Sequence, residues 1–306
     1  MPKRATGNDE LLVCLGRENP SRLVNRLAPK QPRKVVILLS VFGDESHDET
    51  AARVFAVAGL FGNDEQWGDL EKNWLTLTSG KVFHATECDT DQGAFAGIPH
   101  EENKKLYKGL TQVLCNSKII GFGSAVDIAG HHEFFPDVPV DMPYYKCFRD
   151  VVYRCGKWTE WAIPQDRVKF TFDQRIESNY NAGLLYNYMA TLPEWSGYFD
   201  DEISFASRKQ VGIQAADLYA REVMKHLDNM IGPVQRPTRR SMEALLATKR
   251  FGCDLFMREH FEDFRRKFDA VAKNVGVDQG QYVAWLGKYR VRDSVSSRFR
   301  YLIDLK

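Results

Sequence analysis

The stretch VVILLSVFGD, residues 35–44, predicts the central element of the fold. Val35 to Phe42 form a near-continuous apolar run, which is typical of a central strand covered on both faces. Gly43 and Asp44 follow, so we expect Asp44 just beyond the carboxyl end of this strand. Ligands usually bind at that edge of an α/β sheet, because loops and side chains converge there. Asp44 is therefore a candidate functional residue.

Outward from this strand, strand and helix patterns alternate along the chain. A second apolar run, residues 54–61, predicts a hairpin partner for the first. Asn63 and Gln66 have the spacing of a helix N-cap and its reciprocal partner, which predicts a helix over 64–78. The further elements that we expect are a loop or lid over 81–100, helices over 101–116, 144–161, 179–192 and 212–227, strands over 118–128, 168–172 and 203–207, and a C-terminal helix with an apolar stripe of Phe256, Phe261, Phe264 and Phe268. This alternation predicts an α/β fold with a mixed sheet flanked by helices.

The charge is distributed unevenly, although the formal net charge is only +1. Residues 1–40 hold eight Lys or Arg against three Asp or Glu, and residues 236–306 hold sixteen against nine. The residues between them are therefore strongly acidic. Basic ends could hold a polyanion while an acidic centre holds metal, and solvated charge on helical surfaces is the alternative interpretation.

The domain organisation follows from the same patterns. We expect one α/β domain over 34–235 with a helical insertion over 64–116, a basic N-terminal extension over 1–33 and a basic helical C-terminal extension over 236–306. The six cysteines form no CxxC pair, and no apolar run is long enough for a signal segment or a membrane span. We therefore expect a cytoplasmic protein with reduced thiols and no membrane partner.

Two further aspartates occupy places that suggest a site. Asp173 follows the strand predicted over 168–172, and Asp217 lies on a mainly apolar face of the helix predicted over 212–227. A buried carboxylate needs a cation, a metal or hydrogen-bond donors beside it. Asp217 could therefore bind a metal, pair with Arg221 four residues later, or cap a neighbouring backbone segment.

The chain resembles the family that carries the domain of unknown function 3800, which is grouped with ribonuclease H-like folds. The resemblance covers roughly residues 35–250 and depends on four places in the sequence: Asp44-Glu45-Ser46, Phe83-His84-Ala85-Thr86-Glu87, Asp173, and Gln214-Ala215-Ala216-Asp217-Leu218. It implies a ribonuclease H-like mixed sheet. Relative to a minimal sheet of this kind, the chain has the helical insertion and the terminal extensions.

The resemblance also implies a metal site. In ribonuclease H-like enzymes, carboxylates from the first strand, a helix, a later strand and the last helix hold two divalent metals, and oxygen ligands suit Mg²⁺ or Mn²⁺. Asp44, Asp173 and Asp217 match three of those positions. The candidates for the fourth are Glu87 first, Asp150 second, and third Glu45, which would point away from Asp44 in a continuing strand. His84 is either a proton shuttle near the metals or a core histidine.

The function implied is that of a metal-dependent nuclease, which hydrolyses phosphodiester bonds of RNA or DNA. The alternative is a module that binds nucleic acid or protein and retains the fold without the chemistry, since fold does not guarantee function. A phosphotransferase is disfavoured because the chain has neither a GxxxxGK[ST] loop nor a GxGxxG turn.

Overall fold

Six strands form one mixed sheet in the computed structural model, which describes residues 39–48, 50, 52–136, 142–162, 167–174, 179–191, 199–200 and 202–274. The strands are β1 (Leu39–His47), β2 (Val54–Asn63), β3 (Ile120–Asp127), β4 (Val168–Asp173), β5 (Ser204–Ala206) and β6 (Phe251–Phe256). Their order across the sheet is β5-β4-β1-β2-β3-β6. β2 is antiparallel to both of its neighbours, and the other neighbouring strands are parallel. A mixed sheet flanked by helices confirms the predicted α/β fold class.

The central strand β1 extends further than the apolar pattern predicted. It pairs with β2 from Leu39 through His47, so Asp44 lies inside the strand, opposite Ala58, and the prediction that it follows the strand was wrong. The ladder continues through polar residues because its hydrogen bonds join backbone groups. The predicted start of this strand, residues 35–38, lies outside the described residues.

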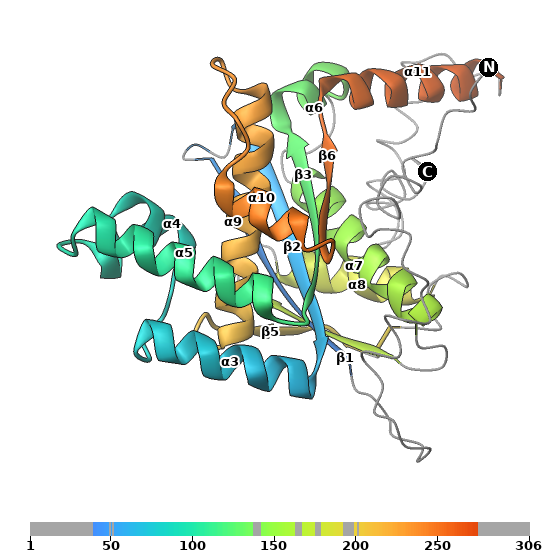
Figure 1. Cartoon of the computed structure of the whole chain (residues 1–306). Helices are drawn as coiled ribbons and strands as arrows, with labels where there is room; N and C mark the ends of the chain where they lie inside the picture. Colours follow the sequence, from blue (N-terminus) through green and yellow to red (C-terminus); the bar gives the residue numbers. More distant parts are fainter. Residues whose placement is uncertain are drawn as a thin grey trace.

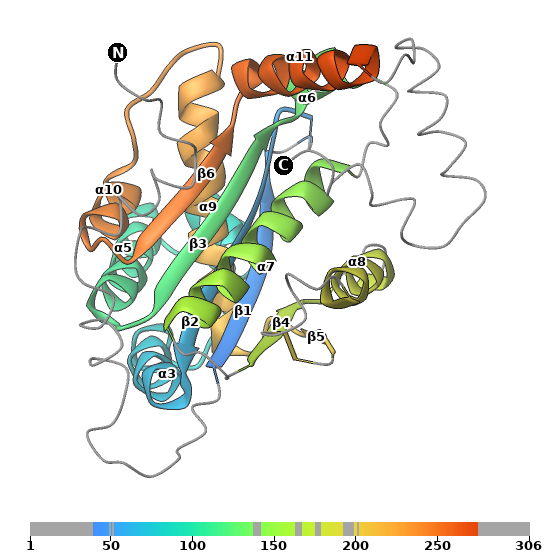
Figure 2. The same cartoon turned by 90° about the vertical axis from the view of Figure 1, so that its right-hand side faces the viewer.

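Helices cover both faces of the sheet (Figures 1 and 2). On one face lie α7 (Met142–Ala162), which contacts β2, β3 and β4, and α8 (Asn179–Thr191). On the other face α9 (Val211–Ile231) contacts β1, β2 and β3. The other helices are α3 (Asp64–Thr78), α4 (Ala85–Thr90), the 3₁₀ helix η1 (Gly93–Phe95), α5 (His100–Asn116), α6 (Ile128–Phe134), α10 (Arg240–Ala247) and α11 (Arg258–Asn274).

Alternation along β1 and β4 decides which side chains meet α9. Val41 and Phe172 belong to the core on the α7 side, whereas Phe42 packs in the core on the α9 side. Successive residues of a strand point to opposite faces, so Asp44 and Asp173 lie on the α9 face. β1 and β4 are parallel neighbours, with Gly43 opposite Phe172, and this places the two aspartates at adjacent positions.

The segment between β2 and β3 contains α3, α4, η1 and α5. Asn63 and Gln66 form the predicted capping box at the start of α3: Gln66 N donates to the Asn63 side chain, and Asn63 N donates to the Gln66 side chain. Residues 81–100, predicted as a loop or lid, instead contain α4 and η1. The short helix α4 was missed because its first backbone amide is capped by a residue far away in sequence, Asp217.

The chain after residue 235 forms α10, β6 and α11 in its described part. The sequence pattern predicted helix here, but Phe256 ends the strand β6, and only Phe261 and Phe264 of the described phenylalanine side chains lie in α11. β6 pairs with β3 at the edge of the sheet, where the Phe251 ring packs on Tyr219 of α9. The predicted extension over 1–33 lies outside the described residues.

Candidate active site

Asp44 is the most buried carboxylate of the candidate site. Its side chain is on β1 and the residue is 1% exposed. Oδ1 accepts a hydrogen bond from the Glu45 amide at 2.7 Å, while Oδ2 has no hydrogen-bond partner among the described residues. Burial raises the pKa of Asp44 well above its ordinary value, and the negative charges of Asp217, Glu45 and Asp173 raise it further. Asp44 therefore lies within a group of acidic side chains.

Asp173 ends β4 beside Asp44 and is paired with a cation. Nε of Arg208 lies 3.2 Å from Oδ2 of Asp173, whose side chain is 6% exposed. Burial opposes the charge of Arg208, but the carboxylates of Asp44, Asp173 and Asp217 outweigh it and raise the pKa of this guanidinium. One arginine therefore interacts with all three aspartates.

Arg208 is a residue of the site that the sequence patterns did not indicate. It lies between β5 and α9, at the carboxyl end of a strand parallel to β4, where ligand-binding residues gather in α/β sheets. Gln214 holds its backbone, because Nε2 of Gln214 donates to the Arg208 carbonyl at 2.9 Å. Its signal in the sequence is a cation directly after a predicted strand end.

Asp217 joins the site from α9. Small or apolar neighbours such as Ala216 and Ala220 are fully buried, which lets the helix lie close to the sheet. Oδ2 of Asp217 accepts hydrogen bonds from Ala85 N at 2.8 Å and from Nδ1 of His84 at 3.0 Å. Asp217 thus caps the first turn of α4.

Among the ion pairs of the described residues, Asp217 does not pair with Arg221, which was one of the alternatives that the sequence left open. The Arg221 guanidinium instead contacts Asp89 of α4, with Nη2 of Arg221 at 3.0 Å from Oδ2 of Asp89. His84 is part of the site surface rather than the core, since its side chain is 24% exposed.

Glu87 is placed differently from the three aspartates. It belongs to α4, and its Oε2 accepts a hydrogen bond from Ala94 N at 3.1 Å in the turn that leads through η1. A Cβ added at Gly93, which has a positive φ of 53°, would lie 2.1 Å from the same oxygen. In this structure the carboxylate faces its own turn.

The other two candidates for the fourth position also differ in place. Asp150 is on α7, across the sheet, where it pairs with Lys146 at 3.4 Å and with Arg149 at 2.5 Å. Burial opposes its ionisation, but the charges of Arg149 and Lys146 lower its pKa. Glu45 follows Asp44 in β1 and is 9% exposed. The structure therefore brings Glu45, and not Asp150, into electrostatic contact with Asp44.

The donor chemistry of the three aspartates fits a hard divalent cation. Carboxylate oxygens are the ligands that Mg²⁺ and Mn²⁺ prefer, and Oδ2 of Asp44 is a buried oxygen without a hydrogen-bond partner among the described residues. The chemistry of the aspartates fits, but their present arrangement does not. Among the described residues, no group of three or more His, Cys, Asp or Glu side chains is arranged so that it could hold a metal ion. Arg208 supplies the positive charge beside Asp173 instead.

Comparison with known proteins finds a distant structural similarity. No protein-family model matches the chain, and no curated protein sequence matches it. The crystal structure of Bst-RNase HIII in complex with Mn²⁺ is similar with a TM-score of 0.37 and 13% sequence identity, over 75% of this chain and 68% of that chain. Within the described residues, no helix is both long and apolar enough to cross a membrane.

Proposed function

We propose that this chain is a metal-dependent nuclease that hydrolyses phosphodiester bonds of RNA or DNA. The observation that supports this function is the electrostatic interaction of Asp44, Asp173 and Asp217, from β1, β4 and α9, together with a buried Oδ2 of Asp44 that has no hydrogen-bond partner among the described residues. Burying several acids together is unfavourable unless a cation is bound among them. The motifs around Asp44, Glu87, Asp173 and Asp217 support membership of the domain of unknown function 3800 family. The cysteine pattern, which has no CxxC pair, supports a cytoplasmic location.

In this proposal Asp44, Asp173 and Asp217 hold Mg²⁺ or Mn²⁺, with Glu87 as the fourth ligand. The chemistry supplied by two such ions is activation of the attacking water and stabilisation of the leaving oxygen. His84 donates through Nδ1 to Asp217, so Nε2 of its ring is the atom that takes or gives a proton. Glu87 has to release the Ala94 amide to reach the other acids.

A second candidate function is a binding or regulatory module without catalysis. The position of Arg208 favours it, because this guanidinium already pairs with Asp173 and interacts electrostatically with Asp44 and Asp217, the acids that a metal would need. If Arg208 stays in place when Mn²⁺ is added, the acids bind no metal and the site does not cleave a substrate. Calorimetric titration with Mn²⁺ separates the two functions, since the nuclease requires binding that Asp44→Asn and Asp217→Asn remove.

Cleavage of labelled single-stranded RNA, single-stranded DNA, duplexes and hybrids in Mg²⁺ or Mn²⁺ tests the nuclease directly. We expect the double variant Asp44→Asn/Asp217→Asn to lose activity by at least about 10³-fold, the scale of removing central electrostatic groups from an active site. The matched control is Asp69→Asn/Glu71→Gln, which removes two charges from exposed positions of α3. Equal cleavage by the wild type and the Asp44/Asp217 variant would refute the proposal.

The fourth ligand is tested by one further variant in the same assay. Glu87→Gln keeps the shape of the side chain and one acceptor oxygen for the Ala94 amide, but it removes the negative charge. We expect a fall in the rate of about 10²-fold together with weaker Mn²⁺ binding. Unchanged Mn²⁺ affinity would exclude Glu87 and leave three aspartates, with Glu45 as the remaining nearby acid.

A further inference from the structure

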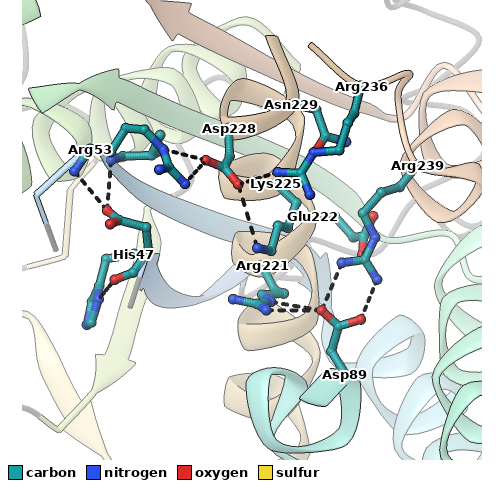
Figure 3. A network of polar contacts seen from close by, with 12 residues as sticks. His47, Arg53, Asp89, Arg221, Glu222, Lys225, Asp228, Asn229, Arg236 and Arg239 are labelled. Carbon is teal, nitrogen blue, oxygen red and sulfur yellow. Dashed lines mark hydrogen bonds and ion pairs between the residues drawn. The ribbon is translucent and has the colours of Figure 1, made fainter. Parts of the chain in front are cut away.

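The face of α9 that carries Asp217 continues into a set of charged residues. Arg221, Lys225 and Asp228 follow Asp217 by four, eight and eleven residues, which are the spacings of one helix face. At 1.5 Å per residue they lie about 6, 12 and 16 Å from Asp217 along the helix axis. Asp217 and these charges therefore form one line along α9, and Figure 3 shows Arg221, Lys225 and Asp228 on that helix.

The first part of this line is balanced in charge. Asp89 of α4 lies between the guanidinium groups of Arg221 and Arg239, with its oxygens 3.0 and 2.7 Å from them (Figure 3). Nε of Arg239 is also 3.3 Å from Glu222, which is fully buried and accepts a hydrogen bond from the Tyr107 hydroxyl at 2.7 Å. Two cations therefore meet two carboxylates, an arrangement that fastens α4 and α5 to α9.

The second part of the line carries an excess of positive charge. Arg53, Lys225 and Arg236 all pair with one carboxylate, Asp228, at 2.8, 3.6 and 3.3 Å (Figure 3). The Asp228 side chain is 1% exposed, whereas those of Arg53, Lys225 and Arg236 are 41%, 24% and 54% exposed. We call these four residues the Asp228 cluster. Its carboxylate is inside, and its three cations reach the surface.

Backbone contacts hold the two arginines of the Asp228 cluster in place. Asp48 accepts hydrogen bonds from Arg53 N and Val54 N, both at 2.9 Å, at the start of β2. The Asn229 carbonyl accepts from Arg236 N at 2.9 Å, which folds the chain after α9 back onto the helix. A cationic group that is positioned before a ligand arrives loses less conformational entropy on binding.

Burial lowers the pKa of Lys225, and the positive charges of Arg221 and Arg239 lower it further, so Lys225 is repelled by the two arginines of the first part of the line. A bound anion would relieve that repulsion. The cluster also lies beyond the carboxyl end of β1, the strand of Asp44, because Arg53 immediately precedes β2, whose Phe55 pairs with His47. A chain of phosphates that places one phosphodiester at Asp44 and Asp217 would bring others to these cations, about five steps away at 3.4 Å per nucleotide of a duplex strand.

We propose that Arg53, Lys225 and Arg236 bind the phosphate backbone of the nucleic acid whose scissile bond lies at the acidic site. The inference rests on the proposed function for the position of the substrate, but it concerns binding and not cleavage. Its partner is a phosphodiester chain, because Lys225 and Asp228 lie about 12 and 16 Å along α9 from Asp217, too far for one small anion to reach both this cluster and the acidic site.

The test is oligonucleotide binding in EDTA, where cleavage does not interfere. Fluorescence anisotropy with single-stranded and duplex probes gives the affinity at several salt concentrations. Each lost phosphate contact lowers the slope of log affinity against log salt concentration by about 1. We therefore expect Arg53→Gln/Arg236→Gln to lower that slope by about 2 and to bind more weakly than the wild type at low salt.

The matched control is Arg258→Gln/Arg266→Gln, which removes two exposed arginines that pair with Glu133 and Asp263 on the surface. It should keep the wild-type slope. Loss of both arginines leaves the buried Asp228 carboxylate with fewer partners, which destabilises the fold. Asp228→Asn therefore provides a second test, because it keeps the three cations and removes the carboxylate that pairs with them. We expect this variant to bind oligonucleotides more tightly than the wild type. A role of the cluster in folding alone predicts weaker binding for this variant.

The inference would be overturned if Arg53→Gln/Arg236→Gln bound oligonucleotides with the affinity and the salt slope of the wild type. It would also be overturned if these substitutions weakened binding of inorganic phosphate but not of oligonucleotides. The outcome is independent of the nuclease proposal. A wild type that binds through the cluster without cleaving would leave this inference standing while the nuclease proposal fails. If the protein cleaves nucleic acid but the two arginines do not affect its binding, the nuclease proposal stands and this inference fails.

Discussion

Asp44 shows how one residue combines folding and function. It lies in the second half of β1 and is 1% exposed. One of its oxygens has no hydrogen-bond partner among the described residues. Burial and the charges of Asp217, Glu45 and Asp173 all raise its pKa. Keeping a carboxyl group here costs stability, which is typical of a residue retained for binding or catalysis.

The effect of the Asp44 carboxyl group on the free energy of unfolding can be measured as a function of pH. Above the unfolded pKa of about 4 the unfolded chain loses the Asp44 proton while the native chain keeps it, so stability falls as pH rises toward the raised native pKa. Asp44→Asn removes this term. In EDTA at pH 8 we expect the variant to be more stable by about 1–3 kcal/mol in urea unfolding, with a smaller gain at pH 4.

The control for this prediction is Asp69→Asn on the exposed side of α3, whose effect should stay within about 0.5 kcal/mol at every pH. Added Mn²⁺ should stabilise the wild type and the control but not Asp44→Asn. A gain in stability that is the same at pH 4 and pH 8 would contradict the pKa argument.

At the scale of elements, the first turn of α9 connects three separate segments through one side chain. Gln214 is 2% exposed, and its Oε1 accepts hydrogen bonds from Nε1 of Trp74 and from Phe83 N, both at 3.0 Å. Its Nε2 donates to the Arg208 carbonyl. Gln214 therefore holds α3, the segment before α4 and the loop that carries Arg208 around the acidic site.

Replacing Gln214 should be far more costly than an ordinary substitution. Gln214→Leu keeps the size of the side chain but leaves two buried donors and one carbonyl without partners, so we expect a loss of about 3–5 kcal/mol in the free energy of unfolding. Gln112→Leu is the control, because Gln112 is hydrogen-bonded to Asn116 on the exposed surface of α5. A loss below about 1 kcal/mol for Gln214→Leu would show that the three segments are held mainly by apolar packing.

At the scale of the whole molecule, β6 joins the chain after residue 235 to the same sheet as Asp44. It is the neighbour of β3, and Phe251 is 1% exposed against the Tyr219 ring, with centroids 5.1 Å apart. Gly121 on β3 gives these rings their space, since an added Cβ would lie 2.4 Å from the Phe251 ring. Packing of this kind couples the stability of the two segments.

A single core substitution tests that coupling. Phe251→Ala should lower the free energy of unfolding of the whole sheet by about 3–5 kcal/mol, whereas Val234→Ala, at a position 71% exposed, should change it by less than about 0.5. Thermal unfolding followed by circular dichroism and by tryptophan fluorescence supplies the measurement. If Phe251→Ala creates a separate early transition and leaves the main one unchanged, residues 236 onward form an independent unit, as the predicted boundary at 235 implies.

The amino-acid sequence by itself determined the elements whose signals are local. Apolar runs mark β1 and β2, and the pair Asn63 and Gln66 predicts the start of α3, because capping involves residues three apart. Alternation of strands and helices was enough for the α/β fold class, and strand ends indicated Asp173. These patterns depend on neighbours within about four positions, so they can be interpreted without the fold.

The tertiary structure alone decided which residues the charged side chains of the site contact. Asp217 contacts His84 and Ala85 rather than Arg221, which is four residues away on the same helix, because α4 lies against this face of α9. Arg208 is drawn to Asp173 by the parallel arrangement of β4 and β5. Which charges meet depends on the sheet order, in which residues more than a hundred positions apart become neighbours, and no local pattern contains that information.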